Sequence, residues 1–146
     1  LLLKSAAQGN AAAMVNLAKQ YMHGRGVQTN VVEAFKWFRQ AAERGDIQAQ
    51  YVLATSPFGV GGFTRDAAEA LAWLQKSAEG GFVLAQFLLG ECYALGQGVV
   101  PKDATKAAYR YAKAAAYGNV QAKSRLLSRQ GNESGISTNS TTKSLK

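Results

Sequence analysis

Apolar residues recur along the chain at helical spacing, in segments that come in pairs. In the first segment of one pair, Ala13, Leu17 and Tyr21 stand four residues apart and define one apolar face. In the second segment, alanine and aromatic residues are spaced likewise between Glu33 and Gly45. Helices of this length are marginal in isolation, so the pattern predicts two antiparallel helices that pack against each other.

The pair returns at a nearly constant interval. Gly9, Gly45 and Gly81 are 36 residues apart, and Gly118 follows after 37. The periodicity predicts the tail of a preceding copy, three full copies and a capping helix, over residues 1–9, 10–45, 46–81, 82–118 and 119–130. Since residues 1–9 match the end of a second helix, we expect the chain to be truncated and the solenoid to continue before Leu1.

One helix pair of this size cannot bury its apolar stripe, whereas stacked pairs bury it continuously. The predicted fold class is therefore all-α, a right-handed α/α superhelical solenoid of antiparallel helix pairs with repeats of about 36 residues. In the second copy, Pro57 replaces a tyrosine. We expect that first helix to end near Thr55 or Ser56, with Phe58 in the tyrosine's place.

The two ends of the chain differ from the repeats. In the capping helix we expect Lys123, Arg125 and Arg129 to form a polar outer face, as a terminal repeat needs. Residues 131–146 are rich in Gly, Ser, Thr and Asn and have few apolar residues. Such a composition cannot bury enough apolar surface to offset the entropy of ordering, so this tail is predicted to be disordered.

Two motifs carry a family resemblance. They read A–x3–LA–x2–Y–x2–GRGV from Ala13 to Val27 and EAFKWFRQAAERGD from Glu33 to Asp46. They resemble the Sel-one-like repeat family, which is related to the tetratricopeptide repeats, and the resemblance covers roughly residues 1–130. It implies a solenoid that serves protein–protein interaction.

A second implication of the resemblance is an alternative function. Some cysteine-rich relatives resemble β-lactam-binding or β-lactam-hydrolysing enzymes and carry paired cysteines in each repeat. This chain has a single cysteine, Cys92, and so departs from that pattern.

The first helices of the copies are expected to line the concave face of the solenoid. With Leu17 and Tyr21 in the core, the other side of these helices would present an apolar and aromatic row of one residue per repeat, formed by Val15, Tyr51 and Phe87. Exposed residues of this kind favour a groove for a protein or peptide partner. The alternative is that neighbouring helices cover them. The predicted groove residues are Val15, Lys19, Met22, Gln48, Tyr51, Thr55, Leu84, Phe87 and Glu91.

No set of residues converges on catalysis or metal binding. His23 is the single histidine, and Cys92 has no histidine at a suggestive spacing, so a packed thiol is the simpler interpretation. Glu33 and Glu69 are explained by helix capping. We therefore expect a non-enzymatic chain without a cofactor or metal ion.

The formal net charge is +8 and is concentrated near the C-terminal end. From Pro101 onward the chain has nine lysines and arginines against Asp103 and Glu133. A basic end permits nucleic-acid binding as a further alternative. The aromatic residues follow the repeat spacing and are better explained as core, which disfavours it. No apolar run is long enough for a membrane span, no signal peptide is visible, and the sequence leaves localisation open.

Overall fold

The computed structural model describes residues 1–24, 29–56, 66–96 and 100–129. All the regular secondary structure in these residues is helical, which confirms the predicted all-α class. The helices are α1 (Leu2–Ala7), α2 (Ala11–His23), α3 (Val31–Glu43), α4 (Ile47–Thr55), α5 (Ala67–Glu79), α6 (Val83–Leu95) and α7 (Ala104–Ala116). A further helical segment over residues 120–129, called the terminal helix below, follows α7.

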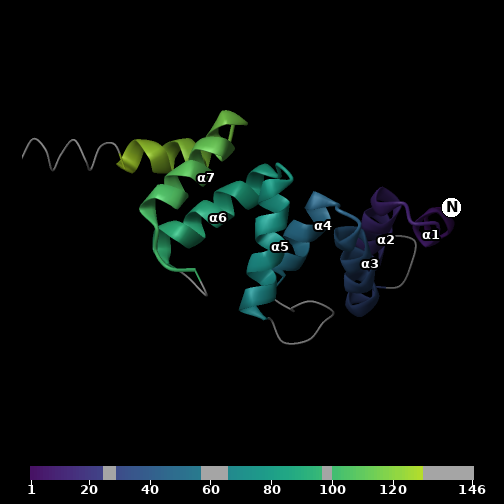
Figure 1. The fold of residues 1–146 in the computed structure, drawn as a ribbon. Coiled ribbons are helices and arrows are strands. Elements are labelled where there is room, and N and C mark those ends of the chain that lie inside the picture. The colour runs from purple at the N-terminus through teal and green to yellow at the C-terminus, as the bar shows by residue number, and fades with distance from the viewer. Residues whose placement is uncertain (25–28, 57–65, 97–99, 130–146) are drawn as a thin grey trace, which may run out of the picture.

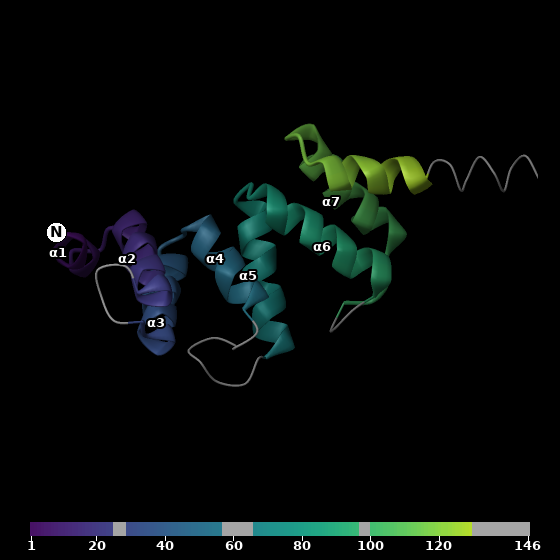
Figure 2. The ribbon, with the colours of Figure 1, turned by 180° about the vertical axis from the view of Figure 1, so that it is seen from behind.

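The helices follow one another along an elongated molecule. In Figures 1 and 2, seen from opposite sides, α1 and the terminal helix lie at opposite ends. Every extensive helix–helix contact among the labelled helices joins helices that are consecutive in the chain, from α1 with α2 to α6 with α7. This is the packing of a solenoid, since a single globule would bring distant repeats together.

A glycine with positive φ joins each second helix to the next first helix. The φ angles are 93° at Gly9, 91° at Gly45, 94° at Gly81 and 92° at Gly118. The N–H of the residue after the glycine reaches back to the preceding helix, as from Phe82 to the Ser77 carbonyl at 3.1 Å. Because this turn recurs with nearly the same angle, successive helix pairs leave it in similar directions.

The residue after each of these glycines is the N-cap of a first helix. The side chains of Asn10, Asp46 and Asn119 accept a hydrogen bond from a backbone N–H three residues on, at 2.8–3.0 Å. At the same position before α6, Phe82 offers no such bond. Its ring packs instead on Tyr51, with the centroids 5.1 Å apart. A missing cap costs about 1 kcal/mol and an aromatic pair contributes about 0.5–1.5 kcal/mol, so the exchange is close to balanced.

Two buried glutamines tie first helices to the helices that precede them. The side-chain amide of Gln50 donates to the Ala42 carbonyl at 3.1 Å, and that of Gln86 donates to the Ala78 carbonyl at 3.2 Å. Each accepting carbonyl lies in the last turn of a second helix and also accepts the N–H of a glycine in the turn that follows, at 3.0 Å from Gly45 and 3.1 Å from Gly81. The glutamine bonds therefore add to these turns and fix the rotation of the next helix against the preceding one.

The core runs along the molecule and becomes smaller at one end. One cluster of buried residues extends from α1 to α6, and a second, smaller cluster contains Ala107, Tyr111, Ala114 and Ala122. The helix that precedes Pro57 ends at Thr55, which confirms the predicted early stop. Pro57, Phe58 and the tail over 131–146 lie outside the described residues.

The recurring turn leads to a stability prediction at Gly81. Gly81→Ala should lower the free energy of unfolding by about 1–2 kcal/mol, because a Cβ is strained at positive φ. No neighbouring atom lies within 4 Å of the position that this Cβ would take, so the lost stability would come from backbone strain and not from a steric clash. Gly81→Asn should cost less, since asparagine tolerates this conformation better. Urea unfolding followed by circular dichroism measures both, and an alanine variant as stable as wild type would contradict the turn geometry.

Candidate binding face

The first helices α2, α4 and α6, together with the terminal helix, carry the predicted groove residues and their continuation; this surface is called the first-helix face below. The expected row of exposed residues is wrong at Val15, which is 3% exposed and packs within the main core cluster. Tyr51 and Phe87 are half-buried. The Tyr51 ring packs on Phe82, and the Phe87 ring lies 5.9 Å from that of Tyr111. Neighbouring side chains therefore cover much of the row.

The other predicted groove residues on α2, α4 and α6 differ in exposure. Gln48 is exposed and Leu84 is 48% exposed, whereas Lys19, Met22 and Thr55 are half-buried. The Lys19 ammonium donates to the Gln48 side-chain oxygen at 3.4 Å, which links α2 to α4. The Thr55 hydroxyl donates to the Tyr51 carbonyl within α4 at 2.9 Å. The accessible positions are thus Gln48 and Leu84, with the half-buried residues beside them.

A hollow of about 340 Å³ lies between α6 and the terminal helix. Its lining includes Phe87 and Glu91, which the sequence predicted, and Gln121, Ser124 and Arg125, which it did not. The repeat spacing could have identified two of the missed residues. Moving 37 residues on from Leu84 and Phe87 gives Gln121 and Ser124, so the same register continues into the terminal helix.

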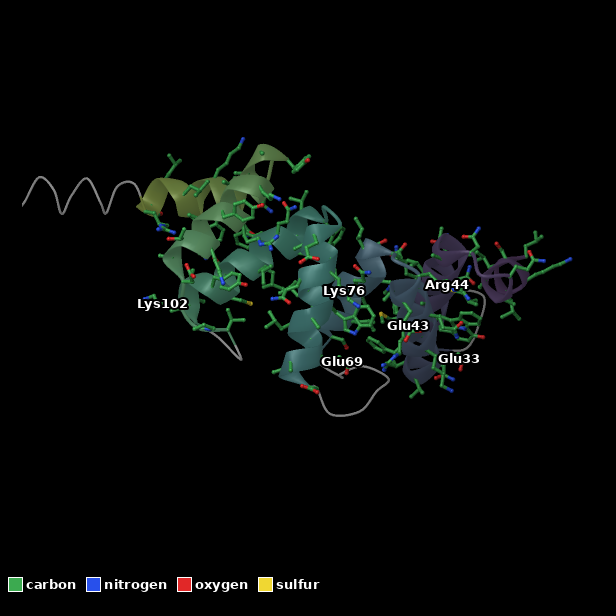
Figure 3. The ribbon with its side chains drawn as sticks, in the orientation of Figure 1. Glu33, Glu43, Arg44, Glu69, Lys76 and Lys102 are labelled. Carbon is green, nitrogen blue, oxygen red and sulfur yellow. The ribbon has the colours of Figure 1, made fainter. Side chains whose placement is uncertain are left out.

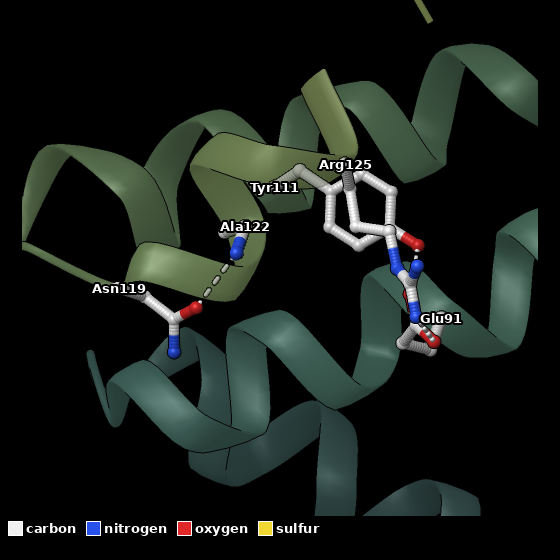
Figure 4. A network of polar contacts seen from close by, with 5 residues as sticks. All are labelled: Glu91, Tyr111, Asn119, Ala122 and Arg125. Atoms are coloured by element: carbon white, nitrogen blue, oxygen red, sulfur yellow. Dashed lines mark hydrogen bonds and ion pairs between the residues drawn. The ribbon is translucent and has the colours of Figure 1, made fainter. Parts of the chain in front are cut away.

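Glu91 lies at the centre of a polar network inside this hollow (Figure 4). The Tyr111 hydroxyl donates to the Glu91 carboxylate, and Arg125 binds both of its oxygens, at 2.8 Å from Nε and 3.2 Å from Nη2. Lys123 and Arg125 are exposed, as the expected polar outer face requires, and the Arg125 side chain remains 56% exposed while it pairs with Glu91. Arg129 is half-buried, and its guanidinium donates to the Ala104 carbonyl of α7.

Close packing of α6 on α7 allows this network to form. Tyr111 is 2% exposed, and its ring lies against Gly90 of α6. A Cβ at Gly90 would come within 2.8 Å of the Tyr111 ring. The absence of a side chain at Gly90 therefore lets the ring sit against α6, with its hydroxyl at the Glu91 carboxylate.

The network fixes the protonation state of its members. Burial raises the pKa of Glu91, but the hydrogen bonds from Arg125 and Tyr111 outweigh it, and the net effect is a lowered pKa. Burial and the bond to Glu91 raise the pKa of Tyr111. Near neutral pH, Glu91 is therefore an ionised acceptor and Tyr111 a protonated donor.

The described residues assemble no group of three or more His, Cys, Asp or Glu side chains that could hold a metal ion. His23 is exposed at the end of α2, and Cys92 is half-buried on α6. Among the helices that the structure describes, none has both the length and the apolar character needed to cross a bilayer. The chemistry that this face offers is contact through polar, aliphatic and aromatic side chains.

The network predicts a stability loss that depends on pH. Glu91→Gln should lower the free energy of unfolding near neutral pH by about 1–2 kcal/mol, because an ionised acceptor for Tyr111 and Arg125 is lost. The folded-state pKa of Glu91 is depressed, so its contribution is present above its unfolded pKa and disappears as pH falls through the folded value. The gap in thermal midpoint between wild type and variant should therefore close well below pH 4.5, the ordinary value for this side chain.

A matched control is Glu79→Gln, since Glu79 has no ion pair within the described part of the chain. This control should leave the thermal midpoint almost unchanged near neutral pH. A constant gap for Glu91→Gln across the acid range would contradict the assigned network.

Residues 11–46, 47–82 and 83–120 each match the Sel1 repeat family. Among solved structures, the chain is similar to a Sel1 repeat protein from Oxalobacter formigenes, with 38% identity and a TM-score of 0.80 over 87% of this chain and 95% of that one. It is also similar to c5321, a protective antigen with an SLR fold from uropathogenic Escherichia coli. That match has 35% identity and a TM-score of 0.74 over 83% of this chain and 26% of that one. No curated protein matches the chain. With three matching repeats along a solenoid of helix pairs, the chain belongs to the Sel1 repeat family.

Proposed function

We propose that the chain is a non-catalytic scaffold that binds a peptide or protein partner along the first-helix face. Sel1 repeats generally form protein–protein interaction scaffolds and typically act as non-enzymatic modules. The observation that carries the proposal is a ladder of equivalent positions. Gln48, Leu84 and Gln121 are all exposed, and each occupies the same place in its repeat. A partner lying along the solenoid would meet one of these side chains on α4, on α6 and on the terminal helix.

The ladder combines an apolar anchor with polar contacts. Leu84, at 48% exposed, offers apolar surface near the middle of the face. Gln48 and Gln121 on either side can both donate and accept hydrogen bonds, as the backbone of an extended peptide requires. This alternation suits a partner that alternates apolar side chains with exposed backbone groups.

The half-buried residues beside the ladder would add contact area with little loss of entropy. Tyr51 and Phe87 are already held by Phe82 and Tyr111, so binding would immobilise few additional rotamers. Lys19, Met22 and Thr55 border the N-terminal half of this surface, and Glu91 lies in the hollow at its other end. Val15 supports the face from within the core and makes no contact in this proposal.

The test is a charge placed on the ladder and compared with the same charge elsewhere. Leu84→Glu should weaken binding of a partner captured and identified with the wild-type chain by about tenfold or more, because it buries a carboxylate against apolar surface. Val32→Glu is the matched control, since Val32 is 50% exposed but lies on the second helix α3. Titration of the labelled partner measures both affinities.

Equal affinity of the wild-type and Leu84→Glu chains would contradict the proposal, and so would equal losses in the two variants. The double change Tyr51→Ala and Phe87→Ala should also weaken capture. Because both rings pack on neighbouring side chains, the double variant could also be destabilised. Its helicity and thermal midpoint are therefore compared with those of the wild-type chain.

A further inference from the structure

The second helices border a separate cleft of about 560 Å³ between α5 and α7. It is lined by residues of both helices and by the end of α6, among them Gln75, Glu79, Tyr93, Lys106, Tyr109 and Arg110. None of these residues belongs to the first-helix ladder. The cleft is therefore a second surface whose chemistry can be considered by itself.

Comparison with the preceding junction explains why this cleft is open. Between α3 and α5, Arg39 pairs with Glu69 at 3.4 Å, and Trp73 is only 8% exposed. Figure 3 shows charged side chains on these two helices, with Glu33 and Glu43 on α3 and Glu69 and Lys76 on α5. The first junction thus has an ion pair across it and a buried indole.

One repeat further on, all three closing residues have changed. In the 36- and 37-residue register, Gln75 takes the place of Arg39, Lys106 that of Glu69, and Arg110 that of Trp73. Gln75 and Lys106 cannot form the ion pair, and a half-buried arginine replaces the indole. The junction between α5 and α7 therefore has a hollow and two positive charges, where the equivalent positions of its predecessor provide an ion pair and a buried indole.

Aromatic rings hold these charges in place without neutralising them. The Lys106 ammonium lies 5.5 Å from the ring centroid of Tyr93, and the Arg110 guanidinium lies 5.5 Å from that of Tyr109. The Lys113 ammonium lies 4.8 Å from the centroid of the same Tyr109 ring. Within the part of the chain that the structure describes, none of these three cations has a carboxylate partner.

The potential at the mouth of the cleft is positive. A side-chain hydrogen bond with Lys113 lowers the pKa of Tyr109, and the charges of Lys113 and Arg110 act in the same direction. Glu79 is the one carboxylate in the lining, against Lys106 and Arg110. A ligand with several carboxylates is the complement of this surface.

Two segments outside the described residues do not have the charge of such a ligand. The segment 130–146 has one acidic residue, Glu133, against Lys143 and Lys146, and the segment 57–65 has Arg65 and no acidic residue. A second copy of this sequence carries a formal net charge of +8 and would be repelled. Neither these segments nor a second copy therefore complements the cleft.

We propose that the cleft between α5 and α7 binds an acidic segment of a partner protein. Lys106 and Arg110 pair with carboxylates of that segment, and the rings of Tyr93 and Tyr109 pack against its apolar side chains. This surface is independent of the ladder on the first-helix face, so either proposal can fail without the other.

The test uses a short fluorescein-labelled peptide that alternates glutamate with leucine, and a counterpart with glutamine in place of each glutamate. Fluorescence anisotropy with the full chain should show that the glutamate peptide binds and that the glutamine peptide binds at least about tenfold more weakly. Binding of the glutamate peptide should weaken as salt is added. Comparable binding of the two peptides, or no binding of the glutamate peptide, would overturn the proposal.

Two variants locate the binding in the cleft. Gln75→Glu sets a carboxylate beside Lys106, and Arg110→Trp restores the residue found one repeat earlier, so each should weaken peptide binding by about tenfold. Gln40→Glu on α3 makes the same charge change at an exposed position outside the cleft and should have little effect. Equal effects of Gln75→Glu and Gln40→Glu would overturn the assignment.

Binding in the cleft is also distinguished from unfolding, from binding at the first-helix face and from nucleic-acid binding. Gln75→Glu should not lower the urea midpoint, because it adds an attraction across the junction, so its loss of peptide binding would not reflect unfolding. Leu84→Glu should leave peptide binding unchanged, which separates this cleft from the first-helix face. A single-stranded oligonucleotide that binds more tightly than the glutamate peptide and displaces it would replace the proposal with a nucleic-acid site.

Discussion

Burial of the apolar stripe on each helix pair depends on the pair beside it. Among the labelled helices, the extensive contacts join helices that are consecutive in the chain, so the core is extended by one repeat at a time. For this to work, each pair must leave the previous one at the same angle. Glycines with positive φ at 36- and 37-residue intervals provide that angle, and the buried glutamines Gln50 and Gln86 fix the rotation of the helices that follow.

Because the helix pairs repeat the same geometry, a substitution at one equivalent position produces a local difference between neighbouring repeats. Phe82 exchanges an N-cap for an aromatic contact at little net cost. Arg110 and Lys106 line a cleft at positions where the preceding repeat has Trp73, which is buried, and Glu69, which forms an ion pair. The geometry is common to the repeats, whereas the surfaces that can distinguish partners arise where one repeat differs from its neighbours.

Much of the fold was predictable because it follows from short-range rules. The interval between glycines predicted the helix pairs, and Pro57 predicted the end of α4 at Thr55. The surface was harder to predict. Val15 lies outside the stripe of Leu17 and Tyr21, yet it is buried because a first helix is covered by helices on more than one side. Spacing within one helix does not reveal how wide an arc its neighbours cover.

On the first-helix face, too, residues that follow the repeat register were predictable, whereas contacts between residues far apart in the sequence were not. Gln121 and Ser124 were within reach of the sequence, since they extend the register of Leu84 and Phe87 by one repeat. The contact of Arg125 with Glu91 was not, because it joins residues 34 positions apart through a geometry that only the packed helices define. Arginines on the last helix resemble a solvated cap in the sequence, and in three dimensions Arg125 remains exposed but also pairs with a carboxylate of α6.

The restriction of extensive contacts to consecutive labelled helices has mechanical consequences. Tension applied between the two ends is carried mainly through these contacts, one after another. Among the labelled helices, the contact between α5 and α6 is the least extensive of those between consecutive helices. Under strain we expect this contact to open first while the helices on either side stay packed, so that a bound partner spanning several repeats would hold the two parts together.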